Sequence, residues 1–209
     1  MLMTRIFPKP LTLSAFWLII SSCILCSGQV QKNYYTLPAF SSDHTINAVI
    51  EIPGGSNKKY EYDAHSGQFV IDQQDGIDRV VDFLPYPANY GFIPSTLSNA
   101  IEGGDGDALD VLLISESIAT GSVVEAIPIA MLKLIDDGEK DFKIISVPAR
   151  KELRIIKALT YDDLSTNYGA LIRIIETWFL NYNPKEVSTL EGWGDEKEAL
   201  REIQRHRKK

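Results

Sequence analysis

The sequence predicts a mainly β protein in which a small barrel or a strongly curved sheet is covered by helices. Three observations support this fold class. Short β-like runs follow one another about every ten residues, the turns between them are rich in Gly, Asn, Ser and Asp, and helical periodicity appears only in the C-terminal third. The composition, 44% hydrophobic and 23% charged, is that of a globular domain with a substantial core.

The first 28 residues have the pattern of a signal peptide. They contain two basic residues, no acidic one, and the apolar run Leu11–Ile20, which falls short of the roughly 20 residues that a permanent membrane span needs. Cys23 stands where a lipoprotein signal carries its lipid, whereas Cys26–Gly28 would suit an ordinary signal peptidase. We expect an exported protein, either periplasmic or anchored to the membrane through a lipid; the alternative is an unprocessed, cytoplasmic N-terminus.

Charge and cysteine usage exclude several classes of function. Both cysteines lie in the signal-like region, so the folded part uses neither a disulfide nor a catalytic thiol. Loss of residues 1–28 would change the net charge from −7 to −9. Nucleic acid is not an expected partner, because the only basic cluster is Arg205–Lys209, which is typical of a solvated helix end.

Residues 29–44 are polar and aromatic without a period, and we expect them to form a tether before a domain at residues 45–209. The domain should begin with an antiparallel meander, since Gly-rich or Ser-rich turns separate its first β-like runs. These runs are 48–53, 59–63, 68–72 and 79–84.

The second half of the domain should change from strands to helices. Further strands are expected at 110–115, 123–134 and 142–147. Apolar residues recur at helical spacing from Leu171 to Tyr182, and Pro184 should end that helix. Asp195, with Glu198 three residues later, resembles a capping box that begins a last helix.

The most informative stretch is the acidic loop, which we define as Gly103–Asp110. It places Asp105, Asp107 and Asp110 within six residues, and carboxylates so close repel one another unless a cation lies between them. Mg²⁺ fits, because it prefers oxygen ligands and leaves coordination positions to water and phosphate. An EF-hand loop does not fit, since Asp110 occupies its glycine position; a calcium-binding nonapeptide repeat lacks a second copy. A solvated acidic turn remains an alternative.

Other polar residues extend this pattern. Asp136 and Asp141 form a second acidic group, and Lys143 would share a strand face with Asp141, although an exposed hairpin tip would look the same. The segment Tyr86–Phe92 holds two tyrosines and an amide around a turn just before the acids. The three histidines are scattered, so neither a zinc site nor a Ser-His-Asp triad is supported.

Together these motifs resemble those of the soluble family I inorganic pyrophosphatases, from about Ala48 to Ile203. The signature Asp-Gly-Asp-x-x-Asp-Val stands at Asp105–Val111, after Tyr-Pro-x-Asn-Tyr-Gly and before Asp-x-x-x-x-Asp-x-Lys. The resemblance implies a five-stranded, OB-like closed β-barrel with helices outside. It also implies hydrolysis of pyrophosphate to two phosphates by direct attack of a metal-bridging hydroxide, with several Mg²⁺ ions that Mn²⁺ is expected to replace.

The resemblance assigns a role to each matching residue. Asp107 would be the catalytic base. The metal-binding residues would be Asp105, Asp110 and Asp141 for the tightest ion, Asp136 and Glu51 for ions that arrive with substrate, and Glu61 for the metal-bound waters. The substrate-binding residues would be Lys59, Arg79, Tyr90, Lys143 and Tyr182, with Tyr86 beside them. A homo-oligomer is expected on the same ground.

One position departs from the family pattern. The family has Lys after the tyrosine that ends the helix, but here Asn183 follows Tyr182. Either Lys185 replaces this cation or one phosphate is held more loosely. A non-catalytic calcium-binding or phosphate-binding barrel is the alternative function, but the presence of Asp107 favours an enzyme, because a binding module needs no base.

Overall fold

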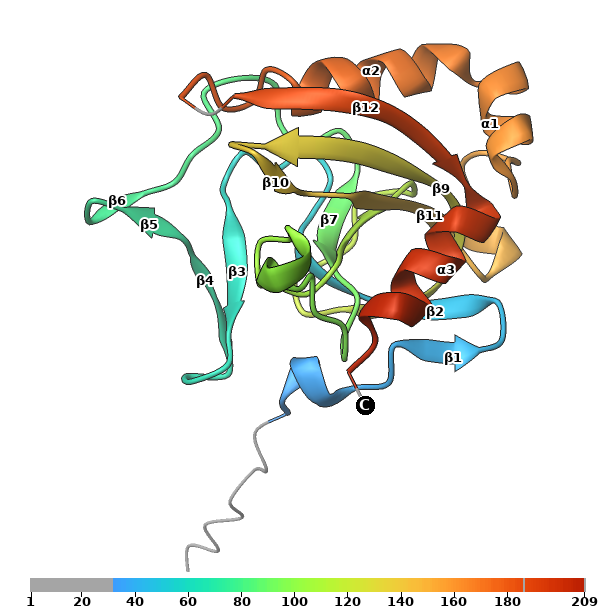
Figure 1. Cartoon of the computed structure of the whole chain (residues 1–209). Helices are drawn as coiled ribbons and strands as arrows, with labels where there is room; N and C mark the ends of the chain where they lie inside the picture. Colours follow the sequence, from blue (N-terminus) through green and yellow to red (C-terminus); the bar gives the residue numbers. More distant parts are fainter. Residues whose placement is uncertain (1–31, 186, 209) are drawn as a thin grey trace, which may run out of the picture. The chain divides into compact units, whose positions relative to one another are not determined.

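The structure, a computed structural model, describes residues 32–185 and 187–208, so the signal-like segment lies outside it. The described residues form mainly β-structure with three α-helices (Figure 1). The strands are β1 (Phe40–Ser42), β2 (Thr45–Ile52), β3 (Tyr60–Asp63), β4 (Gln68–Ile71), β5 (Gln73–Gln74), β6 (Ile77–Asp78), β7 (Asn89–Phe92), β8 (Asp110–Leu113), β9 (Val123–Asp136), β10 (Glu139–Lys140), β11 (Lys143–Pro148) and β12 (Ser188–Asp195). The helices are α1 (Tyr161–Asn167), α2 (Gly169–Phe179) and α3 (Glu196–His206).

Five strands pair in a circuit that returns to its start. β2 pairs with β7, β7 with β8 and β11 with β9, all antiparallel, while β8 and β11 are parallel. β9 also pairs with β2, so the order of hydrogen-bonded neighbours ends where it began. β1, β10 and β12 extend this sheet, whereas β3–β4 and β5–β6 are separate two-stranded hairpins.

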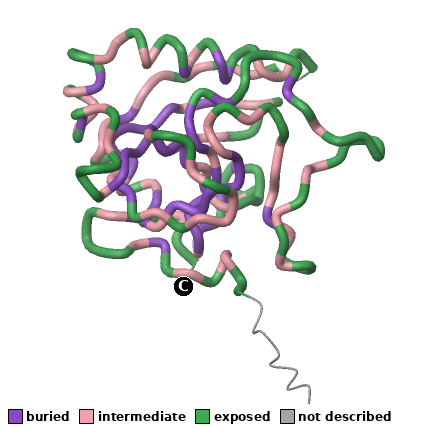
Figure 2. Tube along the Cα trace, turned by 180° about the vertical axis from the view of Figure 1, so that it is seen from behind, coloured by how far each residue is buried: buried purple, intermediate pink, exposed green. Residues whose placement is uncertain are grey.

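The buried segments gather in the strands of this circuit (Figure 2), and their side chains pack in separate clusters, one of which includes side chains of α1 and α2 and another side chains of α3. β2, β8, β9 and β11 contribute aliphatic side chains that are almost fully removed from water, for example Ile50, Leu112, Leu132 and Ile145. Burial of each such side chain contributes roughly 1.5–3 kcal/mol. The buried aliphatic residues of these strands therefore hold in place the backbone that carries the polar site residues.

Pro128 lies within the long strand β9, where its missing N–H removes one donor from the ladder. The pairing of β9 with β11 is irregular at this point: Ser146 is opposite Pro128, while the preceding Ile145 is opposite Ala130. One residue of β9 is left without an opposite partner, as in a β-bulge. The strand predicted for 123–134 thus forms despite the proline.

The predicted antiparallel meander is wrong in two respects. β2 pairs with β7 and β9 rather than with β3, so the run 48–53 does not pair with the run 59–63, whereas the runs 59–63 and 68–72 do pair antiparallel as β3 and β4. The run 79–84 forms no strand; only Val80 makes an isolated bridge, to Lys58. Val81 is buried in the core, but Phe83 and Leu84 are exposed, and among the described residues no strand forms a ladder with this run.

Residues 29–44 were expected to form a tether, yet the described part of this segment packs on the sheet. A 3₁₀ turn spans Tyr34–Thr36, β1 pairs with β2, and Ala39 is buried in the core. The basic C-terminus is also bound rather than frayed: Arg207 bridges Thr96, and the N–H of Lys208 donates to a backbone carbonyl 2.8 Å away.

The two predicted helices are confirmed in type and place. α2 buries Ile175, Trp178 and Phe179, and the Asp195 carboxylate accepts a hydrogen bond from the N–H of Glu198 at 2.7 Å, which caps α3. α1 and β12 were not predicted. Of the helices in the described ranges, none combines the length and apolar character needed to cross a bilayer.

Candidate active site

All thirteen residues singled out from the sequence line a single cleft. It encloses about 370 Å³ and is bordered by β2, β3, the acidic loop, the β9–β10 turn and the end of α2. The thirteen are Glu51, Lys59, Glu61, Arg79, Tyr86, Tyr90, Asp105, Asp107, Asp110, Asp136, Asp141, Lys143 and Tyr182. Tyr35, Asp137 and Glu139 also line this cleft and were not anticipated.

Backbone geometry shapes the acidic loop. Gly103 and Gly106 have φ values of 85° and 89°, a region that side chains disfavour. At Gly104 a Cβ would lie 2.8 Å from the backbone carbonyl carbon of Ser98, so the close approach of two backbone segments requires glycine there. The N–H of Asp107 donates to the Asp105 carboxylate at 3.0 Å, which fixes the turn between the two acids.

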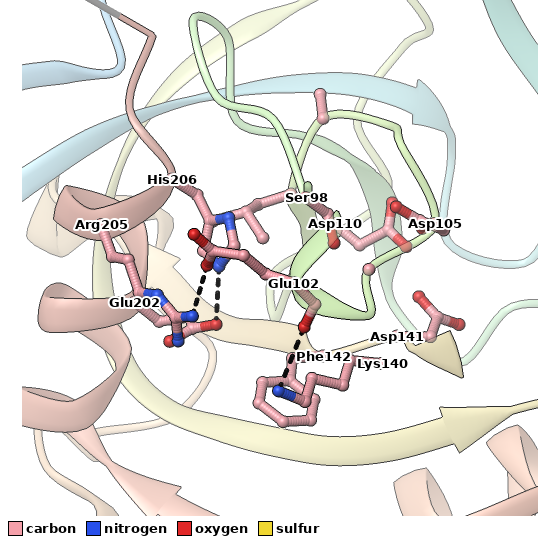
Figure 3. Close-up of a pocket in the computed structure, with 13 residues that line it drawn as sticks. Ser98, Glu102, Asp105, Asp110, Lys140, Asp141, Phe142, Glu202, Arg205 and His206 are labelled. Atoms are coloured by element: carbon pink, nitrogen blue, oxygen red, sulfur yellow. Dashed lines mark hydrogen bonds and ion pairs between the residues drawn. The ribbon is translucent and has the colours of Figure 1, made fainter. Parts of the chain in front are cut away.

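Side chains of α3 line a small pocket beside the acidic loop (Figure 3). Arg205 forms an ion pair with Glu102, just before the loop. The ring of His206 lies between two oxygens, the carbonyl of Leu97 at 2.8 Å and the carboxylate of Glu202 at 3.0 Å. The three aspartates drawn in Figure 3, Asp105, Asp110 and Asp141, line the other side of this small pocket.

The parallel pairing of β8 with β11 places Asp110 directly opposite Lys143. The Lys143 ammonium, only 4% exposed, donates to the carboxylates of Asp110 and Asp141 and to the Tyr90 hydroxyl at 3.0 Å. Burial opposes the ammonium charge, but the two carboxylates outweigh it and raise the pKa of Lys143. Lys143 is thus a permanent cation between two candidate metal ligands.

Glu51, near the end of β2, is the most enclosed acid of the cleft. Its carboxylate accepts a hydrogen bond from the N–H of Tyr62 at 2.7 Å, and it is 8% exposed. Burial raises the pKa of Glu51 to about 8, although this hydrogen bond opposes the shift. A cation is therefore needed if Glu51 is to be ionised at neutral pH.

Asp107 differs from its neighbours in the loop. Its carboxylate makes no hydrogen bond or ion pair with any residue in the described ranges, whereas Asp110 and Asp141 are both bound by Lys143. Partial burial raises the pKa of Asp107, and the charges of Asp105 and Glu61 add to the effect. An open carboxylate with a raised pKa is suited to accept a proton.

Two cations at another side of the cleft are held by an acid that the sequence analysis missed. Asp72 lies 2.8 Å from the Arg79 guanidinium and 3.6 Å from the Lys59 ammonium, which also pairs with Glu61 at 2.7 Å. Asp72 and Arg79 flank the β5–β6 hairpin, so this contact closes the base of the hairpin. No local motif marked Asp72, because its partners are set by tertiary contacts.

Aromatic rings form the wall that carries the tyrosines. Trp178 of α2 stacks on Tyr182, with ring centroids 4.8 Å apart, and contacts Tyr86 at 4.5 Å. The indole N–H donates to the Leu84 carbonyl at 2.8 Å. This packing holds the rings of both tyrosines at the cleft.

Asn183 and Lys185 do not line the cleft. They lie with Tyr182 along an adjoining space of about 360 Å³ beside the β5–β6 hairpin. The N–H of Lys185 donates to the Asn183 side chain at 3.2 Å. Of the two alternatives, replacement of the family lysine by Lys185 therefore has no support in this arrangement.

The chemistry of the donor set fits Mg²⁺. The acidic side chains of the cleft supply only carboxylate oxygens, the ligands that hard divalent ions prefer, and they are too many for the cations around them. Within the described part of the chain, no three of these acids already form a ready-made metal site. Lys143 explains part of this, since it occupies the space between Asp110 and Asp141.

Comparisons with known proteins agree with the site. Residues 48–209 match the sequence profile of the family described as inorganic pyrophosphatase. The inorganic pyrophosphatase of Neisseria meningitidis serogroup B is 41% identical over 162 residues, 76% of this chain and 84% of that protein. That of Sulfolobus acidocaldarius is 35% identical over 171 residues, 80% and 92% of the two chains.

Solved structures of inorganic pyrophosphatases are also similar to this chain. The crystal structure of the inorganic pyrophosphatase from Thermus thermophilus superposes with a TM-score of 0.72 at 31% identity and covers 84% of this chain and 97% of its own. That from Neisseria gonorrhoeae has a TM-score of 0.65 at 35% identity, with 83% and 96% covered. With its acidic loop, its carboxylate-lined cleft and these relatives, the chain belongs to the inorganic pyrophosphatase family, enzymes that hydrolyse pyrophosphate.

Proposed function

We propose that this chain is a Mg²⁺-dependent pyrophosphatase in which water attacks one phosphorus directly, without a covalent enzyme intermediate. The gathering of thirteen sequence-predicted residues in one cleft is the observation that carries this proposal. The described residues offer no Ser–His or Cys–His pair at the cleft, which agrees with direct attack. Mn²⁺ is expected to replace Mg²⁺.

We assign the acids to the metals and to the proton. Asp105, Asp110 and Asp141 would hold the tightest ion, while Asp136 and Glu51 would hold ions that enter with substrate and Glu61 would orient their waters. Bound Mg²⁺ would lower the pKa of the attacking water and neutralise charge on pyrophosphate. Asp107 would take the proton, since its carboxylate has no partner among the described residues.

The cations and phenols would hold the substrate. Lys59 and Arg79 would bind one phosphate group through charge-assisted hydrogen bonds, and Lys143 would bind another while it also contacts Asp110. Tyr90 and Tyr182 would donate to phosphate oxygens, with Tyr86 beside them. A strongly anionic substrate thus enters an acidic cleft only because these groups and the metals offset its charge.

The architecture and the location of the protein are also proposals. The circuit of pairings from β2 back to β2 supports a closed, OB-like, five-stranded barrel. We also propose a homo-oligomer, which the family resemblance supports. We further propose export directed by residues 1–28 with a lipid on Cys23, which the sequence pattern supports. Membrane fractions of cells should contain the wild type but not Cys23→Ala; identical fractionation would reject the lipid anchor.

The decisive experiment measures phosphate release from pyrophosphate. We expect turnover with Mg²⁺ or Mn²⁺ at neutral to alkaline pH and none in EDTA. A folded protein that binds phosphate or Ca²⁺ but releases no phosphate with either metal would be a binding module instead.

A further inference from the structure

One short stretch of chain, Ser95–Asn99, lies between the acidic loop and the residues that end and follow α3. We call this stretch the support segment. On one side it is bonded to the chain after α3, because the N–H of Lys208 donates to the Ser95 carbonyl at 2.8 Å. The N–H of Leu97 donates to the His206 carbonyl, also at 2.8 Å. The support segment is therefore fastened to the end of α3.

On its other side the support segment is bonded to the acidic loop. The N–H of Ser98 donates to the Asp107 carbonyl at 2.6 Å, and the N–H of Gly106 donates to the Ser98 carbonyl at 2.8 Å. The Thr96 hydroxyl accepts a hydrogen bond from the N–H of Leu109 at 2.9 Å, just before β8 begins. These three bonds hold the backbone on which the acids of the loop are mounted.

The acidic loop has little burial of its own to hold it in shape. From Glu102 to Asp107, every residue except Gly104 is exposed. The carboxylates of the loop also repel one another while no cation lies between them. If Mg²⁺ binds only the ordered loop, its apparent affinity depends on the fraction of molecules in which the loop is ordered. The bonds to the support segment therefore matter for metal binding.

His206 is the side chain that links α3 to the support segment. Its Nδ1 lies 2.8 Å from the Leu97 carbonyl oxygen, and its Nε2 lies 3.0 Å from the Glu202 carboxylate, one turn earlier in α3. A carbonyl oxygen can only accept, so Nδ1 donates this hydrogen bond. The helix itself is anchored, because Ala199 and Ile203 are buried. The ring thus connects a fixed helix to the segment that holds the loop.

We propose that His206 is a positioning residue of the active site: through the Leu97 carbonyl it fixes the support segment, and through that segment it holds the acidic loop in the arrangement that binds Mg²⁺. This inference rests on the metal-binding role proposed for Asp105 and Asp110. His206 does not line the cleft, so it acts through the backbone and not on the substrate.

The test compares His206→Asn with His206→Gln. The Asn amide nitrogen can take the place of Nδ1 and donate to the Leu97 carbonyl, whereas the Gln amide nitrogen takes the place of Nε2 and faces Glu202. Both variants remove the imidazole and any charge on it, so the difference between them reports one hydrogen bond. We expect His206→Gln to raise the Kd for Mg²⁺ about 3- to 10-fold, and His206→Asn to stay within about 2-fold of the wild type. Calorimetry without substrate measures both values.

A second readout needs neither metal nor turnover. Hydrogen exchange in EDTA reports how often the loop opens, because the N–H groups of Ser98, Gly106 and Leu109 lose their hydrogen bonds when it does. Mass spectrometry of peptides that cover residues 95–110 should show faster exchange in His206→Gln than in His206→Asn or the wild type.

Ile203→Val controls for a general loss of stability. Ile203 is buried on the same helix, and removal of one methylene group should lower the Tm by roughly 3 to 6 °C. The Kd for Mg²⁺ and the exchange of residues 95–110 should remain at wild-type values in this variant, because the hydrogen bond to Leu97 is kept.

The outcomes separate this inference from the proposed function. An unchanged Kd in His206→Gln, or equal losses in the Asn and Gln variants, would overturn the positioning role. A loss of Mg²⁺ affinity in Ile203→Val as large as that in His206→Gln would overturn it too, since stability alone would then explain both. A wild type that binds Mg²⁺ but releases no phosphate would reject only the proposed hydrolysis. A wild type that does not bind Mg²⁺ would reject both proposals.

Discussion

The carboxylates of the cleft divide into two groups according to the cations beside them. Asp110 and Asp141 already bind the Lys143 ammonium, while the carboxylate of Asp107 has no partner in the part of the chain that the structure describes. In the mechanism that we propose, this difference separates the metal ligands from the base. An acid that must exchange a proton in each cycle cannot be permanently bound to a cation.

Substitution of the two kinds of acid should therefore give different defects. Asp107→Asn should lower kcat by about 10² to 10⁴ with Mg²⁺ affinity nearly unchanged, because an amide cannot accept the proton. Asp110→Asn should weaken Mg²⁺ binding and turnover together. Calorimetry measures the Mg²⁺ affinities, and steady-state kinetics over a range of Mg²⁺ concentrations measures kcat and its rescue. Full rescue of Asp107→Asn by excess Mg²⁺ would make Asp107 another ligand.

Glu51 should make the metal-free protein sensitive to pH. Its pKa is raised from 4.5 to about 8, so the folded state binds a proton that the unfolded state has released between these values. The contribution of Glu51 to the free energy of unfolding is fully present below about pH 4.5 and is lost as pH rises through 8. The slope of this loss is up to about 1.4 kcal/mol per pH unit. Glu51→Gln should lack this loss. Urea unfolding in EDTA at several pH values measures the free energy of unfolding of both proteins. If this free energy changed with pH in the same way in the wild type and in Glu51→Gln, the loss could not be assigned to Glu51.

At the scale of elements, the site depends on where strands and helices end. Asp110 begins β8 and Lys143 begins β11, and the parallel register of these strands brings the two residues together. The end of α2 carries Trp178, which packs against two tyrosines of the cleft. α3 contacts the segment before the acidic loop through His206, whose ring lies 2.8 Å from the Leu97 carbonyl oxygen.

The loop after α2 allows a test of Asn183, which stands where the family has Lys. Asn183→Lys should lower KM for pyrophosphate with little change in kcat, because an added cation would strengthen binding of ground state and transition state alike. Lys185→Ala should leave both constants unchanged, since Lys185 lies outside the cleft. A raised KM in Lys185→Ala would show that this lysine reaches the phosphate after all.

At the scale of the whole molecule, an acidic protein with an acidic cleft should be stabilised by the ion that it binds. Mg²⁺ at about 100 times its Kd adds about 2.7 kcal/mol to the free energy of unfolding, which raises the Tm by roughly 5 to 10 °C. Differential scanning fluorimetry in EDTA and in Mg²⁺ measures this shift. NaCl at matched ionic strength controls for screening, and Asp110→Asn should show a smaller gain. Equal Tm values in Mg²⁺ and NaCl would argue against a structural contribution of bound metal.

Most of the candidate site could be predicted because its information is local. Three aspartates in six residues, with glycines among them, indicate a cation whatever the rest of the chain does. Amphipathic spacing similarly predicted α2, and the capping residues predicted the start of α3. The strand predicted for 79–84 does not form, since β-like composition does not provide a neighbouring strand to pair with.

The sequence by itself determined the acidic chemistry, the family and the position of the C-terminal helices, because motif spacing and helical periodicity are properties of neighbouring residues. Only the tertiary structure decided that β2 pairs with β7 and β9, that Asp72 holds two cations, and that Tyr35 lines the cleft. Each of these contacts joins residues whose meeting depends on how the strands and loops pack. Strand register and core packing fix such contacts, and no local pattern in the chain encodes them.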